Sequence, residues 1–258
     1  MKRLVATFTG HIFRLPILNL FNQSEIKKQY NRLLYKNKIN LLQPAVDLYL
    51  RPDNPLLLSL EYYQLNVRYG IGKFKKELPI CVIVPGYNLL REEEVYLKFL
   101  RSIENQNYTN YQVVLTDDAS TDGTYEAVKK KIQEFPRLRT RTILIKNYQN
   151  IASLGNKVLM VHKHCKEGSI VFDMDADDSL IGRQVMKLIN ACYQSSDAWF
   201  IYSNYLHFNR NYASGLSREI PKAVFAANSY RTSSQWVTGH LRTYYRDLFV
   251  KIPLEYFT

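Results

Sequence analysis

Cysteine is scarce in this sequence, and the few cysteines present are not arranged as pairs. The 258 residues contain three of them, Cys81, Cys165 and Cys192, and none belongs to a C-x-x-C motif. An odd number of cysteines at wide spacing is not the pattern of a disulfide-stapled domain. We therefore expect no disulfide framework and a reducing compartment.

Long apolar runs are also missing. The best candidate, residues 4–21, is interrupted by His11, Arg14 and Pro16. A helix that crosses a bilayer needs about 20 consecutive, mostly apolar residues. The sequence therefore predicts no transmembrane helix.

Two common nucleotide-binding signatures are absent. No G-x-G-x-x-G follows the first predicted strand, and the chain contains no Walker A loop. Those glycine-rich loops bring backbone N–H groups against phosphates in dinucleotide-dependent enzymes and in P-loop ATPases. Both of these classes are disfavoured, although the predicted fold class is similar to theirs.

Acidic residues are outnumbered: 35 Lys and Arg stand against 23 Asp and Glu, for a formal charge of +12. Such a surface suits phosphate-bearing ligands, anionic lipid, nucleic acid or an acidic partner protein. No recognised nucleic-acid-binding motif is present, so a specific nucleic-acid partner is not expected.

The basic bias is strongest in residues 1–40, where eight Lys or Arg accompany one acid, Glu25, for a net charge of +7. Apolar residues are interleaved among these charges. This composition is typical of an organellar transit segment, or of a basic segment that lies on a membrane surface or a partner protein. A flexible basic arm is the alternative. The expected locations are the mitochondrion or the cytosolic face of a membrane.

The chain divides near residue 79. Proline punctuates residues 1–78, which we predict to be a basic N-terminal extension. From residue 79 on, short β-rich apolar runs alternate with amphipathic helical patterns. The predicted strands are residues 80–85, 111–115, 140–145, 169–174 and 199–202, and the predicted helices are residues 91–106, 125–132, 154–165 and 181–192. Residues 79–258 are therefore expected to form an α/β domain, with a mostly parallel central sheet flanked by helices.

Three predicted strands end in residues that folding alone does not require. They are followed by Pro85-Gly86-Tyr87-Asn88, by Thr116-Asp117-Asp118 and by Asp175-Ala176-Asp177-Asp178. The carboxyl ends of parallel strands meet at one edge of a sheet, and ligands bind there. The sequence therefore predicts that these three segments converge on one site.

The third of these segments is the most informative. Asp173, Asp175, Asp177 and Asp178 lie within six positions. Carboxylates this close repel one another, and a hard divalent cation with phosphate oxygens as further ligands relieves that repulsion. This pattern indicates a metal–phosphate site. The alternative is a solvated acidic turn in which Asp178 or Ser179 caps the next helix.

Taken together and in this order, the segments resemble family 2 glycosyltransferases, which have the nucleotide-sugar-binding GT-A fold. Residues 81–88 (CVIVPGYN) are similar to the family's first strand and turn, and residues 115–124 (LTDDASTDGT) to its second-strand signature. Residues 175–178 (DADD) are similar to its D-x-D metal motif. The later segment 236–251 resembles a donor-side loop of some members. The likeness covers about residues 79–250.

The resemblance implies roles for particular residues. Pro85 and Tyr87, with Asn88 beside them, would frame the base and ribose, and Asp118 would accept a hydrogen bond from the base, most often uracil. A carboxylate suits that task because it can accept from an imide N–H. The other implied contacts to the nucleotide sugar are Asp175, Gly239, His240 and Arg242. Asp177, with Asp178 nearby, would hold Mn²⁺ or Mg²⁺ against the diphosphate of a UDP-sugar.

The chain also departs from the family pattern. Inverting members use an acid well beyond the metal motif as general base, usually in an E-D pair. After Asp178 the acids are Asp197, Glu219, Asp247 and Glu255, with no E-D pair. No catalytic base is identified, although Asp247 is the foremost candidate. In addition, Gly155 stands where an Arg is often found. Two interpretations stay open: a metal-dependent glycosyltransferase, or a non-catalytic GT-A fold acting as an accessory subunit of a larger assembly.

Overall fold

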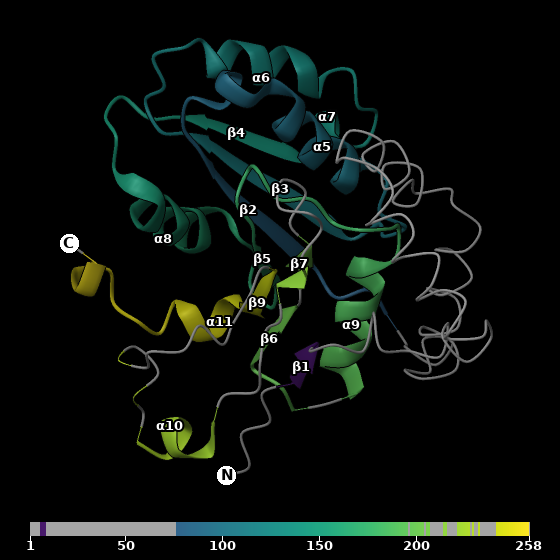
Figure 1. Cartoon of the computed structure of the whole chain (residues 1–258), viewed down its shortest axis with the longest axis vertical. Coiled ribbons are helices and arrows are strands. Elements are labelled where there is room, and N and C mark those ends of the chain that lie inside the picture. Colours follow the sequence, from purple (N-terminus) through teal and green to yellow (C-terminus); the bar gives the residue numbers. More distant parts are fainter. Residues whose placement is uncertain are drawn as a thin grey trace, which may run out of the picture.

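The computed structural model describes residues 6–8, 76–195, 197–203, 205–206, 214–215, 221–227, 229, 232 and 241–257. Within these residues a seven-stranded sheet has the order β1-β6-β9-β5-β2-β3-β4 (Figure 1). Its strands are β1 (Ala6–Phe8), β2 (Ile80–Gly86), β3 (Tyr111–Asp117), β4 (Thr142–Lys146), β5 (Ile170–Asp173), β6 (Phe200–Ser203) and β9 (Arg242–Tyr245). β7 (Tyr205–Leu206) and β8 (Ser214–Gly215) form a separate two-stranded ribbon.

Helices follow most of these strands. They are α5 (Glu93–Glu104), α6 (Thr124–Ile132), α7 (Leu138–Arg141), α8 (Ala152–His164), α9 (Val185–Ser195), α10 (Lys222–Ala226) and α11 (Arg246–Phe249), with 3-10 turns η4 (Leu89–Glu92) and η6 (Leu254–Phe257). The predicted helices are all present. The first begins with the 3-10 turn η4, and α9 starts at Val185 rather than at Ile181 because an irregular turn follows the aspartates.

The central strands are buried on both faces. Along β2, Ile80, Val82 and Val84 pack with α5, α6, α7 and α9 in one core, whereas Cys81 and Ile83 pack with α8 and α11 in the other. Successive side chains of a strand point to opposite faces, so a continuous apolar run fits a strand that is covered on both sides. The prediction of a mostly parallel α/β sheet flanked by helices is confirmed.

The topology brings three strand ends together. β2 pairs in parallel with β3 on one side and with β5 on the other, and β3 pairs in parallel with β4. The chain thus winds outward in one direction from β2 to β4 and then returns to β5 on the opposite side of β2. That reversal is a topological switch point, where open α/β sheets place their ligands.

Four of the described strands, β1, β7, β8 and β9, were not predicted, and among them β9 lies inside the central sheet. Residues 236–251 were expected to include a donor-side loop, but β9 lies antiparallel between β5 and β6. Its sequence Arg-Thr-Tyr-Tyr lacks the apolar run of a buried strand. Thr243 is nevertheless fully buried, and its hydroxyl donates to the Ile201 carbonyl oxygen at 3.1 Å. Tertiary pairing, which the local pattern does not encode, forms this strand.

The cysteine spacing predicted no disulfide framework, but one disulfide is present. Cys81 on β2 and Cys165, directly after α8, are joined by a disulfide, whereas Cys192 is a buried free thiol. The two bonded residues are 84 positions apart. They meet because α8 packs on the face of β2 that carries Cys81, and cysteine spacing does not report such a crossing. Burial raises the pKa of the Cys192 thiol to about 12.

Most of the predicted N-terminal extension lies outside the described residues. From residues 1–40 only Ala6–Phe8 are described, and their backbone pairs in parallel with β6 at the edge of the sheet. The division of the chain near residue 79 stays a prediction. Among the described helices, none combines the length and the apolar character needed to cross a bilayer.

Candidate functional site

The carboxyl ends of β2, β3 and β5 border a cleft of about 530 Å³. Its lining residues are Pro85, Gly86, Tyr87, Asn88, Leu89, Arg91, Tyr96, Asp118, Ser153, Asp175, Ala176 and Asp177. The structure therefore brings together the predicted site residues from all three strand ends. Arg91, Tyr96 and Ser153 were not singled out from the sequence because they lie within helical turns rather than at strand ends.

The turn after β2 is shaped by two special backbone positions. A Cβ atom on Gly86 would lie 3.0 Å from Leu89 Cδ1 and 3.1 Å from the Thr116 carbonyl oxygen, so the close approach of these groups requires glycine. Asn88 has a φ of 51°, a left-handed conformation that Asn tolerates better than most residues. Together they turn the chain so that the half-exposed Tyr87 ring borders the cleft.

Hydrogen bonds join this turn to the one after β3. The Asn88 N–H donates to Ser120 Oγ at 2.8 Å, and Asn88 Oδ1 accepts from the Thr121 N–H at 3.0 Å. One step further, the Leu90 N–H donates to Asp122 Oδ2 at 3.1 Å. Asn88 thus lines the cleft and also fixes the two turns against each other.

Asp118 is held firmly at the end of β3. Its side chain is buried, and Oδ1 accepts hydrogen bonds from Asn147 Nδ2 at 2.8 Å and from the Ile151 N–H at 3.0 Å. Burial of the carboxylate works to raise its pKa, but hydrogen bonds from Asn156, Ile151 and Asn147 outweigh it and leave the pKa below its ordinary value. Asp118 is therefore a fixed, ionised acceptor that borders the cleft.

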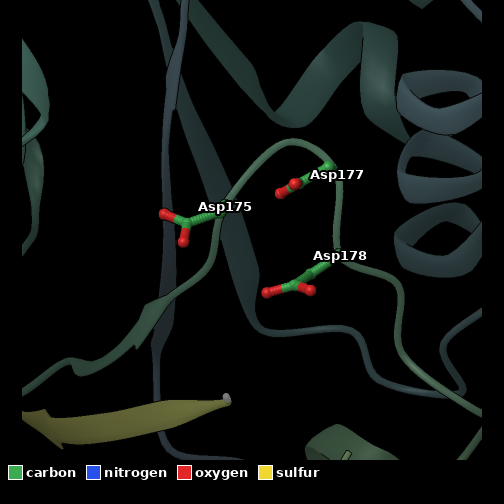
Figure 2. A group of neighbouring side chains, drawn as sticks. All are labelled: Asp175, Asp177 and Asp178. Atoms are coloured by element: carbon green, nitrogen blue, oxygen red, sulfur yellow. The ribbon is translucent and has the colours of Figure 1, made fainter. Parts of the chain in front are cut away.

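Three carboxylates gather in the turn after β5 (Figure 2). Asp175, Asp177 and Asp178 each offer an oxygen, and these oxygens lie within 4.8 Å of one another. Asp177 is exposed, whereas the other two are half-buried. Several carboxylate oxygens at this separation are the ligand set that a hard divalent cation takes.

A lysine that the sequence analysis did not single out contacts this cluster. Lys157 on α8 places Nζ 2.7 Å from Asp173 Oδ1 and 3.0 Å from Asp175 Oδ1. Burial lowers the pKa of Lys157, but the charges and hydrogen bonds of Asp173 and Asp175 outweigh that effect and raise it overall. Lys157 is thus a permanent cation beside the aspartates.

The structure describes only some of the remaining residues that were predicted to contact a nucleotide sugar. Arg242 is half-buried on β9, directly opposite Asp173 in the β5–β9 register. Its Nε is buried and has no hydrogen-bond partner among the described residues. Gly239 and His240 lie outside the described residues, so their predicted contacts stay predictions.

Two of the late acids, Asp197 and Asp247, lie away from the cleft. The Asp247 carboxylate accepts from the Gly168 N–H at 2.9 Å and pairs with Arg246 at 3.1 Å. Gly168 precedes β5, whereas Asp175 follows it, so Asp247 sits at the opposite edge of the sheet. Asp197 likewise precedes β6, which runs in the same direction as β5. This position disfavours Asp247 as the general base, and sequence distance from the metal motif does not reveal on which edge of the sheet an acid lies.

Known proteins share sequence with this chain. It is 27% identical over 128 residues to an Escherichia coli protein named UDP-Glc:alpha-D-GlcNAc-diphosphoundecaprenol beta-1,3-glucosyltransferase WfaP, covering 49% of this chain and 45% of that one. An uncharacterized glycosyltransferase of Haemophilus influenzae is 31% identical over 99 residues, covering 38% of this chain and 28% of that one. The chain thus spans less than half the length of these relatives.

Solved structures are similar as well. Residues 1–349 of S. aureus TarS in complex with UDP match at 21% identity with a TM-score of 0.49, covering 67% of this chain and 48% of that one. The profile of Glycosyl transferase family 2 matches residues 81–252. That match covers more than half of the sequence and includes all three strand ends that border the cleft, so this chain belongs to glycosyl transferase family 2.

Proposed function

We propose that this chain binds a nucleotide-diphospho-sugar, specifically a UDP-sugar, through a divalent cation and acts as a metal-dependent inverting glycosyltransferase. One observation carries the proposal: a fixed carboxylate acceptor, Asp118, and a cluster of three aspartates border the same cleft. A nucleoside diphosphate has matching parts, since a base with an imide N–H is joined through ribose to a diphosphate that binds metal.

Asp118 is the proposed base-reading residue. Its backbone N–H donates to the Gly86 carbonyl oxygen at 2.8 Å, which ties the end of β3 to the end of β2. Tyr87 and Pro85 border the same cleft, and an aromatic face suits stacking on a base. Two Escherichia coli relatives carry UDP-Glc in their names, which supports uracil as the base.

The aspartate cluster is the proposed cation site. Its ligand atoms are all carboxylate oxygens. Mn²⁺ and Mg²⁺ prefer oxygen ligands, whereas softer metals prefer sulfur or imidazole nitrogen. Asp177 and Asp178 would be ligands, with donor phosphates completing the coordination. When bound, the cation would stabilise the charge that develops on the leaving diphosphate. The residues of this chain would hold the donor, with Asp118 orienting the base and Asp175 lying near the ribose or sugar.

Calorimetry of UDP binding, with Mn²⁺ or with a chelator, tests this proposal. Wild-type protein should bind UDP more tightly with Mn²⁺, and Asp177→Ala should remove that difference while the fold persists. Glu167→Ala is a matched control because Glu167 is an exposed acid just before β5, at the opposite end of the strand. Equal UDP affinity of the wild-type protein with and without metal would contradict the proposal.

A second function is favoured by the positions of two late acids. Asp197 and Asp247 lie at the edge of the sheet opposite the cleft, so neither is placed to deprotonate an acceptor bound there. A GT-A fold that binds nucleotide but acts as an accessory subunit would fit that arrangement. Transfer assays separate the two functions, because an accessory subunit would bind UDP without transferring sugar to any acceptor.

A further inference from the structure

The ion pairs of Lys157 link the aspartate cluster to the body of the fold. Its Nζ lies between Asp173, at 2.7 Å, and Asp175, at 3.0 Å. The Lys157 and Asp173 side chains are only 14% and 13% exposed, whereas that of Asp175 is 38% exposed. Ion pairs screened from water in this way are stronger than surface pairs, and losing one partner is costly.

Asp173 anchors this arrangement. It is the last residue of β5, and its neighbour on the same strand face, Val171, packs in the α8 core. Lys157 approaches from α8 above that face. The Lys157–Asp173 pair therefore joins two rigid elements, β5 and α8. Asp175 is the more exposed partner of Lys157, so a cation in the cleft can compete with the lysine for its carboxylate.

The orientation of Asp175 differs from that of the other two aspartates. In Figure 2 the Asp177 and Asp178 side chains extend from the turn toward Asp175, whereas the Asp175 carboxylate extends away from both of them. Its contact with Lys157 accounts for that orientation.

Lys157 itself does not line the cleft. Ser153, one helical turn earlier on α8, is a lining residue, but Lys157 is not among them. A ligand in the cleft would therefore reach Asp175 before it reached the lysine. This position makes Lys157 a group that acts through Asp175 rather than a direct phosphate contact.

We propose that Lys157 is a positioning residue that competes with the divalent cation for Asp175. While Lys157 neutralises Asp175, the cation is left with Asp177 and Asp178 as protein ligands, and it binds well only when donor phosphates add further oxygens. The protein then takes up metal together with the nucleotide rather than before it. This inference rests on the proposed function, since it assumes that the aspartate cluster is a cation site.

The test is Mn²⁺ binding in the absence of nucleotide, measured by electron paramagnetic resonance on the full chain. Lys157→Met should bind Mn²⁺ about tenfold or more tightly than wild type, because a full positive charge beside a ligand carboxylate is removed. Lys157→Arg should stay close to wild type. Lys163→Met, an exposed lysine on the same helix, is the matched control and should change nothing.

A double-mutant cycle distinguishes competition for Asp175 from a long-range repulsion between the Lys157 charge and the bound cation. In an Asp175→Asn background, Lys157→Met should no longer tighten Mn²⁺ binding. If Lys157→Met fails to fold, Asp173→Asn tests the same link, because it leaves Lys157 to Asp175 alone. That variant should bind Mn²⁺ more weakly than wild type, and this loss should also vanish in the Asp175→Asn background.

Three results would overturn the inference. One is unchanged Mn²⁺ binding in Lys157→Met, including no binding in either protein. Another is equal tightening with and without Asp175. The third is a loss of UDP affinity in Lys157→Met with Mn²⁺ binding unchanged, which would make the lysine a direct phosphate contact. Failure of the proposed function is seen separately, as UDP binding that does not respond to metal in the wild-type protein.

Discussion

The Asn88 side chain accepts a hydrogen bond from the Thr121 N–H at 3.0 Å, and so links the turn after β2 to the turn after β3. Asn88 Oδ1 makes this contact while its own N–H donates to Ser120 Oγ. The two turns carry Tyr87 and Asp118, which border the cleft from different strands. Asn88 therefore sets the distance between the two groups proposed to hold the nucleotide base.

Substitution of Asn88 should separate its backbone role from its hydrogen bond. Asn88→Gly keeps the φ of 51° accessible and loses only the side-chain bond, so it should lower the free energy of unfolding by about 1 kcal/mol. Asn88→Ala adds the cost of a left-handed alanine and should lose about 1 kcal/mol more. Urea unfolding measures both. Equal stability of the two variants would show that the backbone conformation contributes nothing.

Asp118→Ala should weaken UDP binding by about 1.5–3 kcal/mol, the usual contribution of a hydrogen bond to a charged group. It should also reduce discrimination between UDP and CDP, because cytosine lacks the imide N–H. Asp118→Asn is the closer control for folding, since an amide oxygen can still accept from the Ile151 N–H that now contacts Asp118. Calorimetry with both nucleotides provides the test. If Asp118→Ala leaves both affinities unchanged, Asp118 lies outside the base pocket.

The bond between Cys81 and Cys165 should contribute to stability, because it restricts a long segment of the unfolded chain. Loss of such a crosslink typically costs about 2–5 kcal/mol. A reducing agent should lower the melting temperature of the wild-type protein but not that of a Cys81→Ala/Cys165→Ala variant. The Cys192→Ala variant is the control, and the reducing agent should still lower its melting temperature. If the reducing agent leaves the melting temperature of the wild-type protein unchanged, the result would argue against this bond.

Asp247→Asn should leave UDP-sugar hydrolysis unchanged, because Asp247 lies at the opposite edge of the sheet. Asp247→Asn should likewise leave the rate of transfer to a panel of acceptors at the wild-type value, whereas loss of a true general base would cost about 10²–10⁴-fold. Product analysis by mass spectrometry measures both reactions. Rapid, metal-dependent transfer that Asp247→Asn abolishes would contradict this placement and would restore Asp247 as the base.

The strand ends could be predicted because their signals are local. An apolar run followed at once by aspartates, as in Ile170 to Asp178, identifies both a buried strand and the polar edge beyond it. Alternation of such runs with helical patterns then places β2, β3 and β5 in one parallel sheet. The α/β fold class and the convergence of the three segments on one site followed from these features, whereas the GT-A fold followed from the resemblance to family 2 glycosyltransferases.

The features that could not be predicted depend on contacts between distant residues. β9 is a strand because β5 and β6 supply its partners, and Cys81 meets Cys165 because α8 crosses β2. Lys157 precedes Asp173 by sixteen positions and reads as one more polar residue of a helix. Its role emerges only when α8 packs above the end of β5.

Anomalous diffraction at the manganese edge, from a crystal soaked with UDP and Mn²⁺, tests the central claim most directly. The account predicts a single strong peak in contact with an Asp177 carboxylate oxygen and with the diphosphate of a UDP molecule whose base lies beside Asp118. UDP bound in the cleft with no manganese peak, or a peak remote from Asp177, would contradict it.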